Sequence, residues 1–311
     1  MKSLVSVRKP IVMKMWEQYP KTWKLLIDLG IFLKYKTLNI NKIPNKIVLP
    51  SENILYVNSD ENRGRALLIK GGVTQKRLRT FWSNAVKYYN PDVIIDVGVN
   101  YGECIFSTTY PSHTKVYGIE ANSKLFQYIE KSRAAHPNKS QITMIHALAS
   151  DSDGDRKWFF IDKHWSGTSS ASYKPSHHMI EKTPVETITI DSLFKEDITP
   201  KNLLFKIDVE GYEAFVLKGM RQLIEKSHTA LGFLEFNSEY IERSGIQADA
   251  FFADLKKYFT IYFYKDDVTI VNAAQKSYKE IQAIFGSLHF HTDFIVAKGD
   301  KIMDSLKLID E

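Results

Sequence analysis

The chain has 311 residues, of which 44% are hydrophobic and 25% charged, and this composition is typical of a globular protein with enough apolar material for a packed core. The single cysteine, Cys104, excludes an internal disulfide and a multi-cysteine zinc site, and it favours a reducing, intracellular setting. No run of about 18 apolar residues and no secretory signal is present, so we expect a cytoplasmic protein that could also contact the inner membrane face.

The positive charge is concentrated near the N-terminus. Residues 1–46 contain ten lysines and arginines against two acidic residues, a net charge of +8, so the rest of the chain sums to about −2 of the total of +6. Large apolar side chains such as Trp16, Trp23 and Phe32 are interleaved with these cations. A basic segment with apolar anchors can lie on an anionic membrane surface. The alternative is a helical cap on the main domain whose lysines face water.

Glycine and proline positions divide the chain into a basic N-terminal extension, residues 1–75, and a main domain, residues 76–311. The main domain opens with a helical pattern over 76–89 and then alternates between short apolar strands and amphipathic helices. Strands are predicted at 93–97, 115–119, 142–148, 203–207, 230–236, 260–264 and 292–297, and helices at 102–108, 123–135, 212–227 and 248–258. This alternation predicts an α/β fold, a seven-stranded doubly wound sheet that is covered by helices on both faces.

Residues 150–200 interrupt this alternation. Two further strands are predicted at 156–161 and 185–190, and a small, polar loop lies between them at 166–173. Insertions at the carboxyl edge of such a sheet commonly shape a substrate pocket. The alternative is a structural hairpin with a mobile tip.

The strand at 93–97 runs through Asp96 into a glycine turn that contains Gly98, Asn100 and Gly102. The glycines allow a tight turn and a close approach of a ligand to the backbone, and the helix that follows offers free N–H groups. A dinucleotide turn would have the G-x-G-x-x-G triplet that serves a pyrophosphate. An acid at the strand end can accept hydrogen bonds from an ammonium group, which a pyrophosphate lacks. The turn therefore favours S-adenosylmethionine.

Acidic residues also follow the next two strands. Glu120 comes 18 positions after Gly102, and Ala121 follows it. The carboxylate of a residue at the position of Glu120 can accept hydrogen bonds from both ribose hydroxyls of a nucleoside. The alternative for Glu120 is an ordinary carboxylate at a helix N-terminus. The third strand leads to Asp151, which the topology would place near an adenine amino group.

A second acidic turn, Asp208-Val209-Glu210-Gly211, follows the strand at 203–207. In an open parallel sheet, ligands bind beyond the carboxyl ends of the strands, at the point where the strand order reverses. The two acidic turns would therefore face one crevice, which is the geometry of a nucleotide-type cofactor site.

Five segments together resemble the FkbM-type methyltransferases, over roughly residues 78–298: 96–103, 119–122, 167–170, 188–193 and 206–213. The segment at 206–213, Lys-Ile-Asp-Val-Glu-Gly-Tyr-Glu, is the most specific of these. The resemblance implies the class I, Rossmann-like methyltransferase fold and S-adenosylmethionine-dependent O-methylation, often of a sugar hydroxyl in a glycan or of a secondary metabolite.

The resemblance also implies roles for the motif residues. The methionine part of the cofactor would be surrounded by Asp96, Gly98, Asn100 and Gly102, the ribose would be held by Glu120, and the reactive methyl would lie near Asp208 and Glu210. Where many relatives have proline and asparagine after the acid, this chain has Ala121 and Asn122, which makes the turn less rigid but keeps the carboxylate.

Methyl transfer to an alcohol needs a general base within hydrogen-bond reach of the hydroxyl. We favour Asp208 as the central carboxylate, beside Glu210, and His164 as a weaker candidate for the base. The remaining candidates are Glu235, His177 and His178, although Glu235 could simply end its strand and the two histidines could be solvated. Asp208, Glu210 and Glu235 could supply oxygen ligands to Mg²⁺, but their spacing does not require a metal and we predict none.

The expected partner is a hydroxyl-bearing acceptor, a saccharide or glycolipid, with peripheral membrane contact through residues 1–46. An RNA methyltransferase is ranked lower, because the lysines are interleaved with apolar residues and no nucleic-acid module is evident. The sequence is also compatible with a secondary-metabolite methyltransferase and with a non-catalytic membrane-surface protein that retains a nucleoside site. A nucleotide-using oxidoreductase would need the missing glycine triplet. No sequence feature specifies an oligomeric state.

Overall fold

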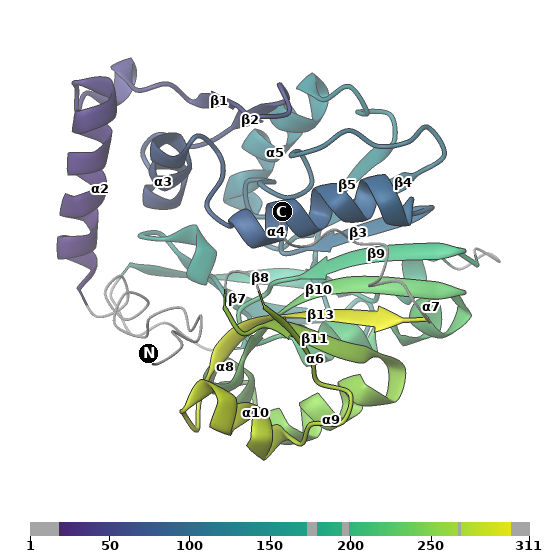
Figure 1. The fold of residues 1–311 in the computed structure, drawn as a ribbon. Helices are drawn as coiled ribbons and strands as arrows, with labels where there is room; N and C mark the ends of the chain where they lie inside the picture. The colour runs from purple at the N-terminus through teal and green to yellow at the C-terminus, as the bar shows by residue number, and fades with distance from the viewer. Residues whose placement is uncertain (1–18, 173–178, 195–198, 267–268, 300–311) are drawn as a thin grey trace.

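The computed structural model describes residues 19–172, 179–194, 199–266 and 269–299. Within these residues the largest sheet has eight strands in the order β12-β11-β13-β10-β9-β3-β4-β5, with helices on both faces (Figure 1). The doubly wound α/β fold predicted from the sequence is confirmed. The strands are β3 (Val93–Val97), β4 (Lys115–Glu120), β5 (Ile142–His146), β9 (Asn202–Ile207), β10 (Thr229–Asn237), β11 (Thr260–Tyr264), β12 (Ile270–Asn272) and β13 (His291–Lys298).

Five neighbouring strands of the sheet are parallel to one another: β10, β9, β3, β4 and β5. Strand β13 lies between β10 and β11 and is antiparallel to both. Each strand predicted for the main sheet is present. The sheet has one strand more than the predicted seven, because the short β12 pairs with β11 at the edge. The predicted strand at 142–148 is interrupted after His146, since Leu148 pairs with a strand of a second sheet.

The central strand β3 is buried along its whole length. Val93, Ile95 and Val97 belong to one apolar cluster, and Ile94 belongs to a second cluster on the other face. A parallel strand that is covered on both faces needs apolar side chains in both directions, which explains why 93–97 reads as a continuous apolar run around Asp96.

Helices cover the two faces of the sheet. One cluster contains side chains of α3 (Asn62–Lys70), α4 (Lys76–Asn84) and α5 (Ser123–Ala135), and a π-helical turn, Ala85–Tyr89, continues α4. The other cluster contains side chains of α6 (Glu213–Lys218), α7 (Arg221–Lys226), α8 (Ser238–Arg243), α9 (Ala248–Tyr258) and α10 (Tyr278–Phe285). The helix α2 (Pro20–Tyr35) packs against α3 at the left of Figure 1.

A smaller sheet, with the order β6-β8-β7, is formed by β6 (Leu148–Ala149), β7 (Arg156–Asp162) and β8 (Ile180–Ile188). It confirms the two additional strands predicted in the inserted region. β8 begins earlier than the predicted residue 185, because it pairs with β7 along the whole of that strand, from Asp162↔Ile180 to Arg156↔Glu186. A further hairpin, β1 (Lys46–Val48) with β2 (Ile54–Tyr56), was not predicted.

Two helix predictions were wrong. Residues 102–108 form successive turns, because Gly102 adopts a left-handed backbone conformation with φ +89°, which is incompatible with an α-helix that starts there. The helix predicted at 212–227 is divided into α6 and α7. The amide of Asp191 donates to the carbonyl of Gly219 at 2.9 Å, and the Asp191 carboxylate accepts hydrogen bonds from the amides of Gln222 and Leu223. Asp191 therefore caps the second helix.

The order of strands reverses between β3 and β9. From β3 the chain continues to β4 and β5 on one side of the sheet, and from β9 it continues to β10 on the other side. Val97 and Ile207, the last residues of β3 and β9, are paired in register. The two acidic turns that follow these strands therefore lie side by side, as predicted.

Candidate active site

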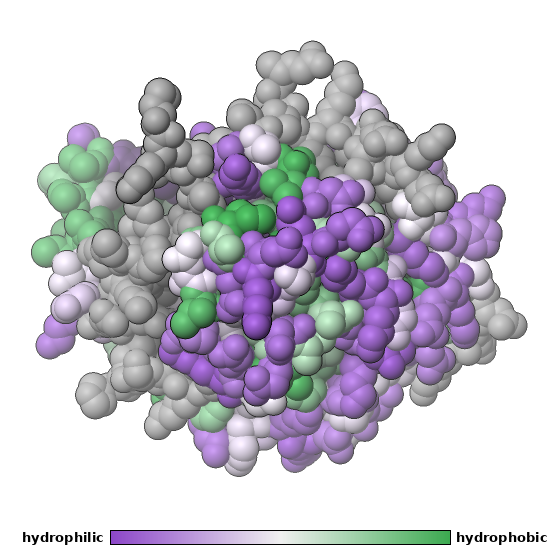
Figure 2. Space-filling model, turned by 60° about the horizontal axis from the view of Figure 1, so that its bottom comes forward, coloured by the Kyte–Doolittle hydropathy of each residue, from purple (hydrophilic) through white to green (hydrophobic). Residues whose placement is uncertain are grey.

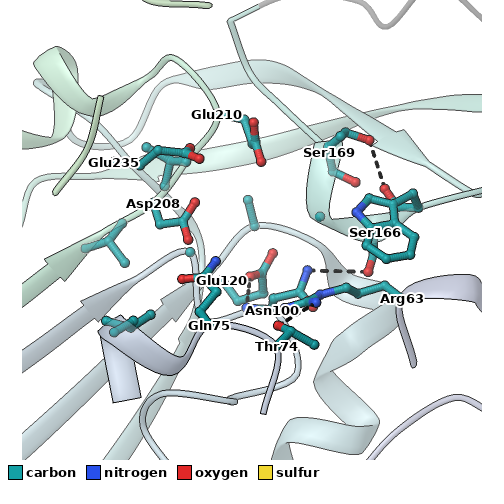
Figure 3. A pocket seen from close by; sticks show the side chains of 18 of the residues that line it. Arg63, Thr74, Gln75, Asn100, Glu120, Ser166, Ser169, Asp208, Glu210 and Glu235 are labelled. Carbon is teal, nitrogen blue, oxygen red and sulfur yellow. Dashed lines mark hydrogen bonds between the residues drawn. The ribbon is translucent and has the colours of Figure 1, made fainter. Parts of the chain in front are cut away.

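A cavity of about 840 Å³ opens at the carboxyl ends of β3, β4, β9 and β10, and its volume is in the range of small-molecule binding sites. Its walls come from three parts of the chain: the strand ends, the loop after β7, and the N-terminal region. Figure 3 shows the carboxylates of Asp208, Glu210 and Glu235 on one side of the cavity, with Arg63 and Ser166 on the opposite side.

The turn after β3 packs directly against the turn after β9. Gly98 lines the cavity and has φ +78°, and a Cβ at this position would lie 2.0 Å from the carbonyl oxygen of Asp208. Only glycine can occupy such a position. The close contact that requires glycine is the one between the two turns, whereas the close approach of a ligand to this backbone stays a prediction.

Two residues that line the cavity have a left-handed backbone conformation although they are not glycines: Asn100, with φ 53°, and Glu210, with φ 54°. Such conformations cost free energy and are maintained only where the surrounding structure enforces them. The amide of Asn100 donates to Glu120 at 2.7 Å. The residues on either side of Glu210 donate their amides to Glu213, at 3.2 Å from Val209 and 3.1 Å from Gly211.

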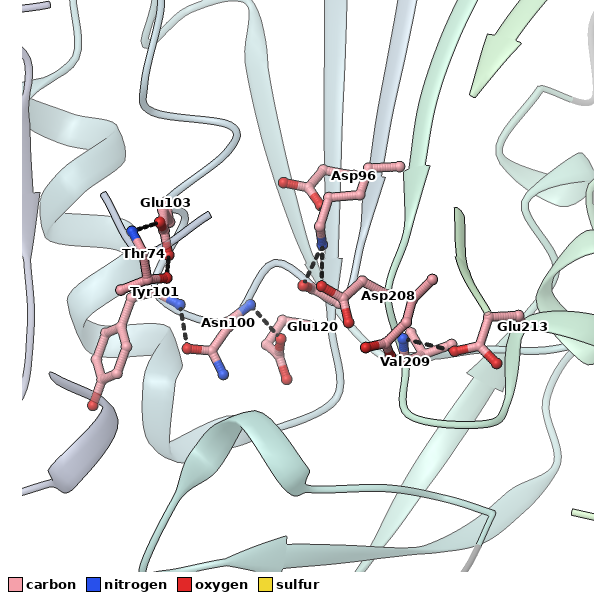
Figure 4. A network of polar contacts seen from close by, with 12 residues as sticks. Thr74, Asp96, Asn100, Tyr101, Glu103, Glu120, Asp208, Val209 and Glu213 are labelled. Atoms are coloured by element: carbon pink, nitrogen blue, oxygen red, sulfur yellow. Dashed lines mark hydrogen bonds and ion pairs between the residues drawn. The ribbon is translucent and has the colours of Figure 1, made fainter. Parts of the chain in front are cut away.

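Glu120 lies at the end of β4 and lines the cavity. Its Oε2 accepts the hydrogen bond from the Asn100 amide (Figure 4). Its Oε1 accepts one from the Asn122 amide at 2.7 Å. Burial raises the pKa of Glu120, while the two amides oppose this increase. Each carboxylate oxygen has a second lone pair, so Glu120 can still accept hydrogen bonds from a ligand.

Asp96 does not line the cavity, contrary to the role that the sequence suggested. It is fully buried, and its Oδ1 lies 3.1 Å from Nζ of Lys206, its partner in the register of β3 and β9. The Lys206 ammonium also donates to the carbonyl of Gly98 at 2.9 Å. Burial by itself would lower the pKa of Lys206, but the carboxylates of Asp96 and Asp208 raise it above its ordinary value. Lys206 therefore stays charged and connects Asp96 to the glycine turn.

Sequence reasoning missed Lys206. The signal was a lysine within the apolar strand segment Leu203–Ile207, because a lysine in a buried strand needs a charged partner. The partner could be identified only once the register between β3 and β9 was known.

Asp208, Glu210 and Glu235 come together at the cavity, each with a carboxylate oxygen within 4.8 Å of the other two. Two basic side chains lie next to them: Lys206 Nζ is 3.8 Å from Asp208 Oδ2, and His291 Nε2 is 2.8 Å from Glu235 Oε1. Oxygen donors at this spacing can bind a hard divalent cation or a cationic ligand. The structure thus groups three of the acids that the sequence singled out, and these three could hold a metal.

His291 was also missed. It lies on β13 with Asp293, and both residues line the cavity. The predicted strand began one residue later, at 292. The signal was two ionisable residues at i and i+2 just before the apolar run Phe294–Ala297, because this spacing places both side chains on one face of the sheet.

Other predicted site residues are not part of the cavity lining. His164 is buried, with Nδ1 3.1 Å from Nδ2 of Asn62, and Asp151 forms an ion pair of 2.8 Å with Lys218. Gly102 packs against the ring of Phe106. The candidates His177 and His178 lie outside the described residues, whereas Ala121 does line the cavity.

The N-terminal region contributes a wall that the sequence did not reveal. Arg63 of α3 donates to Glu103 at 2.8 Å and to Thr74 at 2.9 Å. Glu103, directly after the glycine turn, also accepts hydrogen bonds from the hydroxyl of Thr74 at 2.6 Å and from the amide of Gln75 at 3.1 Å. The lining of this wall is basic and apolar, with Trp23, Ile27, Arg63, Lys70, Lys76 and Arg77.

Glu213 accepts hydrogen bonds from the amides of the turn after β9, and ionisation of its carboxyl should affect the stability of the protein. Burial raises the pKa of Glu213 to about 7 from its ordinary value of 4.5. The native state therefore binds more protons than the unfolded chain between these values, so the contribution of Glu213 to stability decreases as the pH rises through this interval. Glu213→Gln imitates the protonated form. We expect the free energy of unfolding of this variant minus that of wild type to increase by about 3 kcal/mol from about pH 5 to about pH 8.

Urea unfolding at both pH values measures this difference. Glu239→Gln is the matched control for the change from carboxylate to amide, because the side chain of Glu239 is 45% exposed. A constant difference for Glu213→Gln would show that Glu213 does not titrate in this interval.

Comparison with known proteins gives one family. The family model described as Methyltransferase FkbM domain matches residues 96–265, more than half of the chain. The hexuronic acid methyltransferase AglP of Haloferax volcanii is 32% identical over 136 residues, which are 43% of this chain. The chain spans about half of that relative's length, 52%.

The solved structures that resemble this chain share little sequence with it. An O-methyltransferase from Bacillus cereus, solved in complex with SAH, is 11% identical with a TM-score of 0.39, over 73% of this chain and 81% of that chain. The O-methyltransferase TomG from Streptomyces achromogenes, solved in complex with SAM, is 10% identical with a TM-score of 0.40, over 73% and 80% of the two chains.

Proposed function

This chain belongs to the FkbM methyltransferase family, and from that premise we propose that it is an S-adenosylmethionine-dependent O-methyltransferase that acts on a sugar hydroxyl in a glycan or glycolipid precursor. One observation carries the proposal: Gly98, Asn100, Glu120 and the carboxylates of Asp208, Glu210 and Glu235 all border one cavity at the strand-order reversal.

The residues around the cavity fit S-adenosylmethionine. Glu120 keeps a lone pair on each carboxylate oxygen for the two ribose hydroxyls. Beside it an apolar wall can receive the purine, with Ile119, Ala121, Ala147, Leu148, Ala149 and Phe159. The acidic group, Asp208, Glu210 and Glu235, can attract the positive charges of the methionine part. When bound, S-adenosylmethionine supplies a methyl group on a sulfonium.

The acidic group also provides the base that an alcohol acceptor needs. Asp208 lines the cavity, and its side chain is 23% exposed, so a bound hydroxyl can reach it. Lys206, at 3.8 Å, favours the carboxylate form of Asp208, which is the form that can accept the proton of the hydroxyl. The pair of Glu235 and His291 lies next to it and can orient the acceptor through hydrogen bonds.

We assign the acceptor to the basic wall of the cavity, which the extension, residues 1–75, and the first helix of the main domain, residues 76–311, build together. Arg63, Lys70, Lys76 and Arg77 border the cavity, and Figure 3 shows Arg63 across the cavity from the acidic group. Cations at this wall favour an acceptor with a negative charge. A hexuronic acid, the substrate class in the name of the relative AglP, has both the charge and the hydroxyls.

Calorimetric titration with S-adenosylmethionine and S-adenosylhomocysteine tests the cofactor assignment. We expect the wild type to bind both ligands and Glu120→Gln to bind them at least about 10-fold more weakly, because hydrogen bonds to a charged acceptor are worth about 1.5–3 kcal/mol. Glu130→Gln is the matched control, since the side chain of Glu130 is 42% exposed on α5. Absence of binding to the folded wild-type chain would contradict the proposal.

A further inference from the structure

The helix α2 is held to the body of the protein by one face. Ile27 and Ile31 are buried against the neighbouring α3. The ammonium of Lys34 donates to the carbonyls of Leu68 and Ile69, at 2.7 and 3.1 Å, near the C-terminal end of α3. Asp28 forms an ion pair with Arg65 of α3. This helix therefore has a defined orientation, with one face packed and the other directed outward.

The outward face of α2 is apolar. The exposed fractions of its side chains are 68% for Leu25, 45% for Leu26, 52% for Leu29, 47% for Phe32 and 59% for Leu33. These positions recur at intervals of three and four residues, so they form one continuous stripe along the helix. Figure 2 shows apolar side chains gathered at the left edge of the molecule, where α2 lies. We call these five residues the leucine face.

Positive charge surrounds the leucine face. Residues 20–46 contain six lysines and one aspartate, a net charge of +5. Lys21 and Lys36 are exposed at the two ends of the helix, and Lys42 and Lys46 are exposed just beyond it. The segment that carries the leucine face therefore contributes +5 to the net charge of +6 of the whole chain.

We propose that the leucine face is a docking surface for an anionic lipid bilayer, on which α2 lies parallel to the membrane plane. An amphipathic helix with exposed leucine and phenylalanine and flanking lysines is attracted by both the acyl chains and the headgroups of such a surface. The same charge opposes a second copy of this chain as the occupant, because two segments of +5 would meet. No helix among the described residues has the length and hydropathy needed to cross a membrane.

Docking would bring the cavity to the membrane. Trp23 and Ile27, on the inner face of α2, line the cavity, and the ring of Trp23 packs edge-on against Trp165 with 5.7 Å between the centroids. A lipid-linked acceptor could then reach the basic wall from the bilayer. This consequence rests on the proposed function, whereas docking itself does not.

Vesicle flotation with the full-length chain tests the docking. The probes are vesicles of phosphatidylcholine alone and of phosphatidylcholine mixed with anionic phosphatidylglycerol. We expect binding to the anionic vesicles that weakens with salt, and at least a tenfold weaker affinity for the triple variant Leu25→Ser/Leu29→Ser/Leu33→Ser. Leu288→Ser is the matched control, because Leu288 is 76% exposed outside this helix, and it should bind as wild type does.

Thermal melting and sedimentation velocity of the same variants separate the remaining outcomes. Equal melting temperatures for wild type and the triple variant are expected, because the three leucines contact solvent. A lower melting temperature without a change in flotation would show that the chain itself covers the leucine face and would overturn the proposal. A wild-type dimer that the triple variant loses, without vesicle binding, would also overturn it. Failure of S-adenosylmethionine binding would leave the flotation result unaffected.

Discussion

Replacement of Asp208 by asparagine is expected to lower kcat for methyl transfer by a factor of about 10²–10⁴, which is the usual contribution of a positioned general base. The amide has the size of the carboxylate but cannot accept the proton of the acceptor hydroxyl. Asp208 borders the cavity beside Glu210 and Glu235, and its neighbour Lys206 stabilises the ionised form. The Kd for S-adenosylmethionine should change much less than kcat.

The assay measures release of S-adenosylhomocysteine with a hexuronic acid glycoside as the acceptor. Asp254→Asn is the matched control, because the side chain of Asp254 is 40% exposed at the surface and its replacement should leave kcat unchanged. If kcat of Asp208→Asn were close to that of wild type, Asp208 would not be the general base. A loss of kcat by the same factor in His291→Gln would then identify the pair of Glu235 and His291 as the base. Wild-type turnover of a neutral hexose glycoside but not of the hexuronic acid would contradict the charge argument for the acceptor.

Replacement of Lys206 by methionine is expected to lower the free energy of unfolding by about 3–5 kcal/mol, the cost of leaving one charge of a buried pair without its partner. Asp96 is fully buried, and the side chain of Lys206 is 5% exposed. The variant also loses the hydrogen bond to the Gly98 carbonyl, so the turn after β3 should bind the cofactor more weakly.

Urea unfolding of Lys206→Met, Asp96→Asn/Lys206→Met and Lys218→Met tests this prediction. The double variant should recover most of the loss, because no charge is then left buried at Asp96. Lys218→Met removes an exposed ion pair to Asp151, with the lysine side chain 65% exposed, and should cost no more than about 1 kcal/mol. A loss for Lys206→Met as small as that for Lys218→Met would show that the pair with Asp96 contributes little.

The difference between Asp96 and Glu120 shows how far motif reading reaches. Both are acids at the ends of neighbouring strands, and the sequence assigned both to the cofactor. In the structure Glu120 borders the cavity while Asp96 is paired with Lys206 beneath it. Successive side chains in a strand point to opposite faces of the sheet. Whether a given side chain then borders a cavity or contacts a lysine of another strand depends on the residues that pack against that face.

The N-terminal region illustrates the same limit. Its charge and apolar content were evident from composition, and they were compatible both with a membrane-binding segment and with a helical cap. The structure shows that α2 does cap the domain through Ile27 and Ile31 and also exposes its leucine face. Only the packing against α3 decides which apolar residues are buried, because the helix has apolar side chains on both faces.

By itself, the sequence determined the alternation of strands and helices, the doubly wound sheet, the two adjacent acidic turns and the family, since these depend on local periodicity and on short motifs at strand ends. The tertiary structure alone decided that Lys206 neutralises Asp96, that Glu235 and His291 join Asp208 and Glu210 at one cavity, and that residues of α2 and α3 form the opposite wall. These contacts join residues that are tens to hundreds of positions apart, and they arise from strand register and helix packing, which no local pattern encodes.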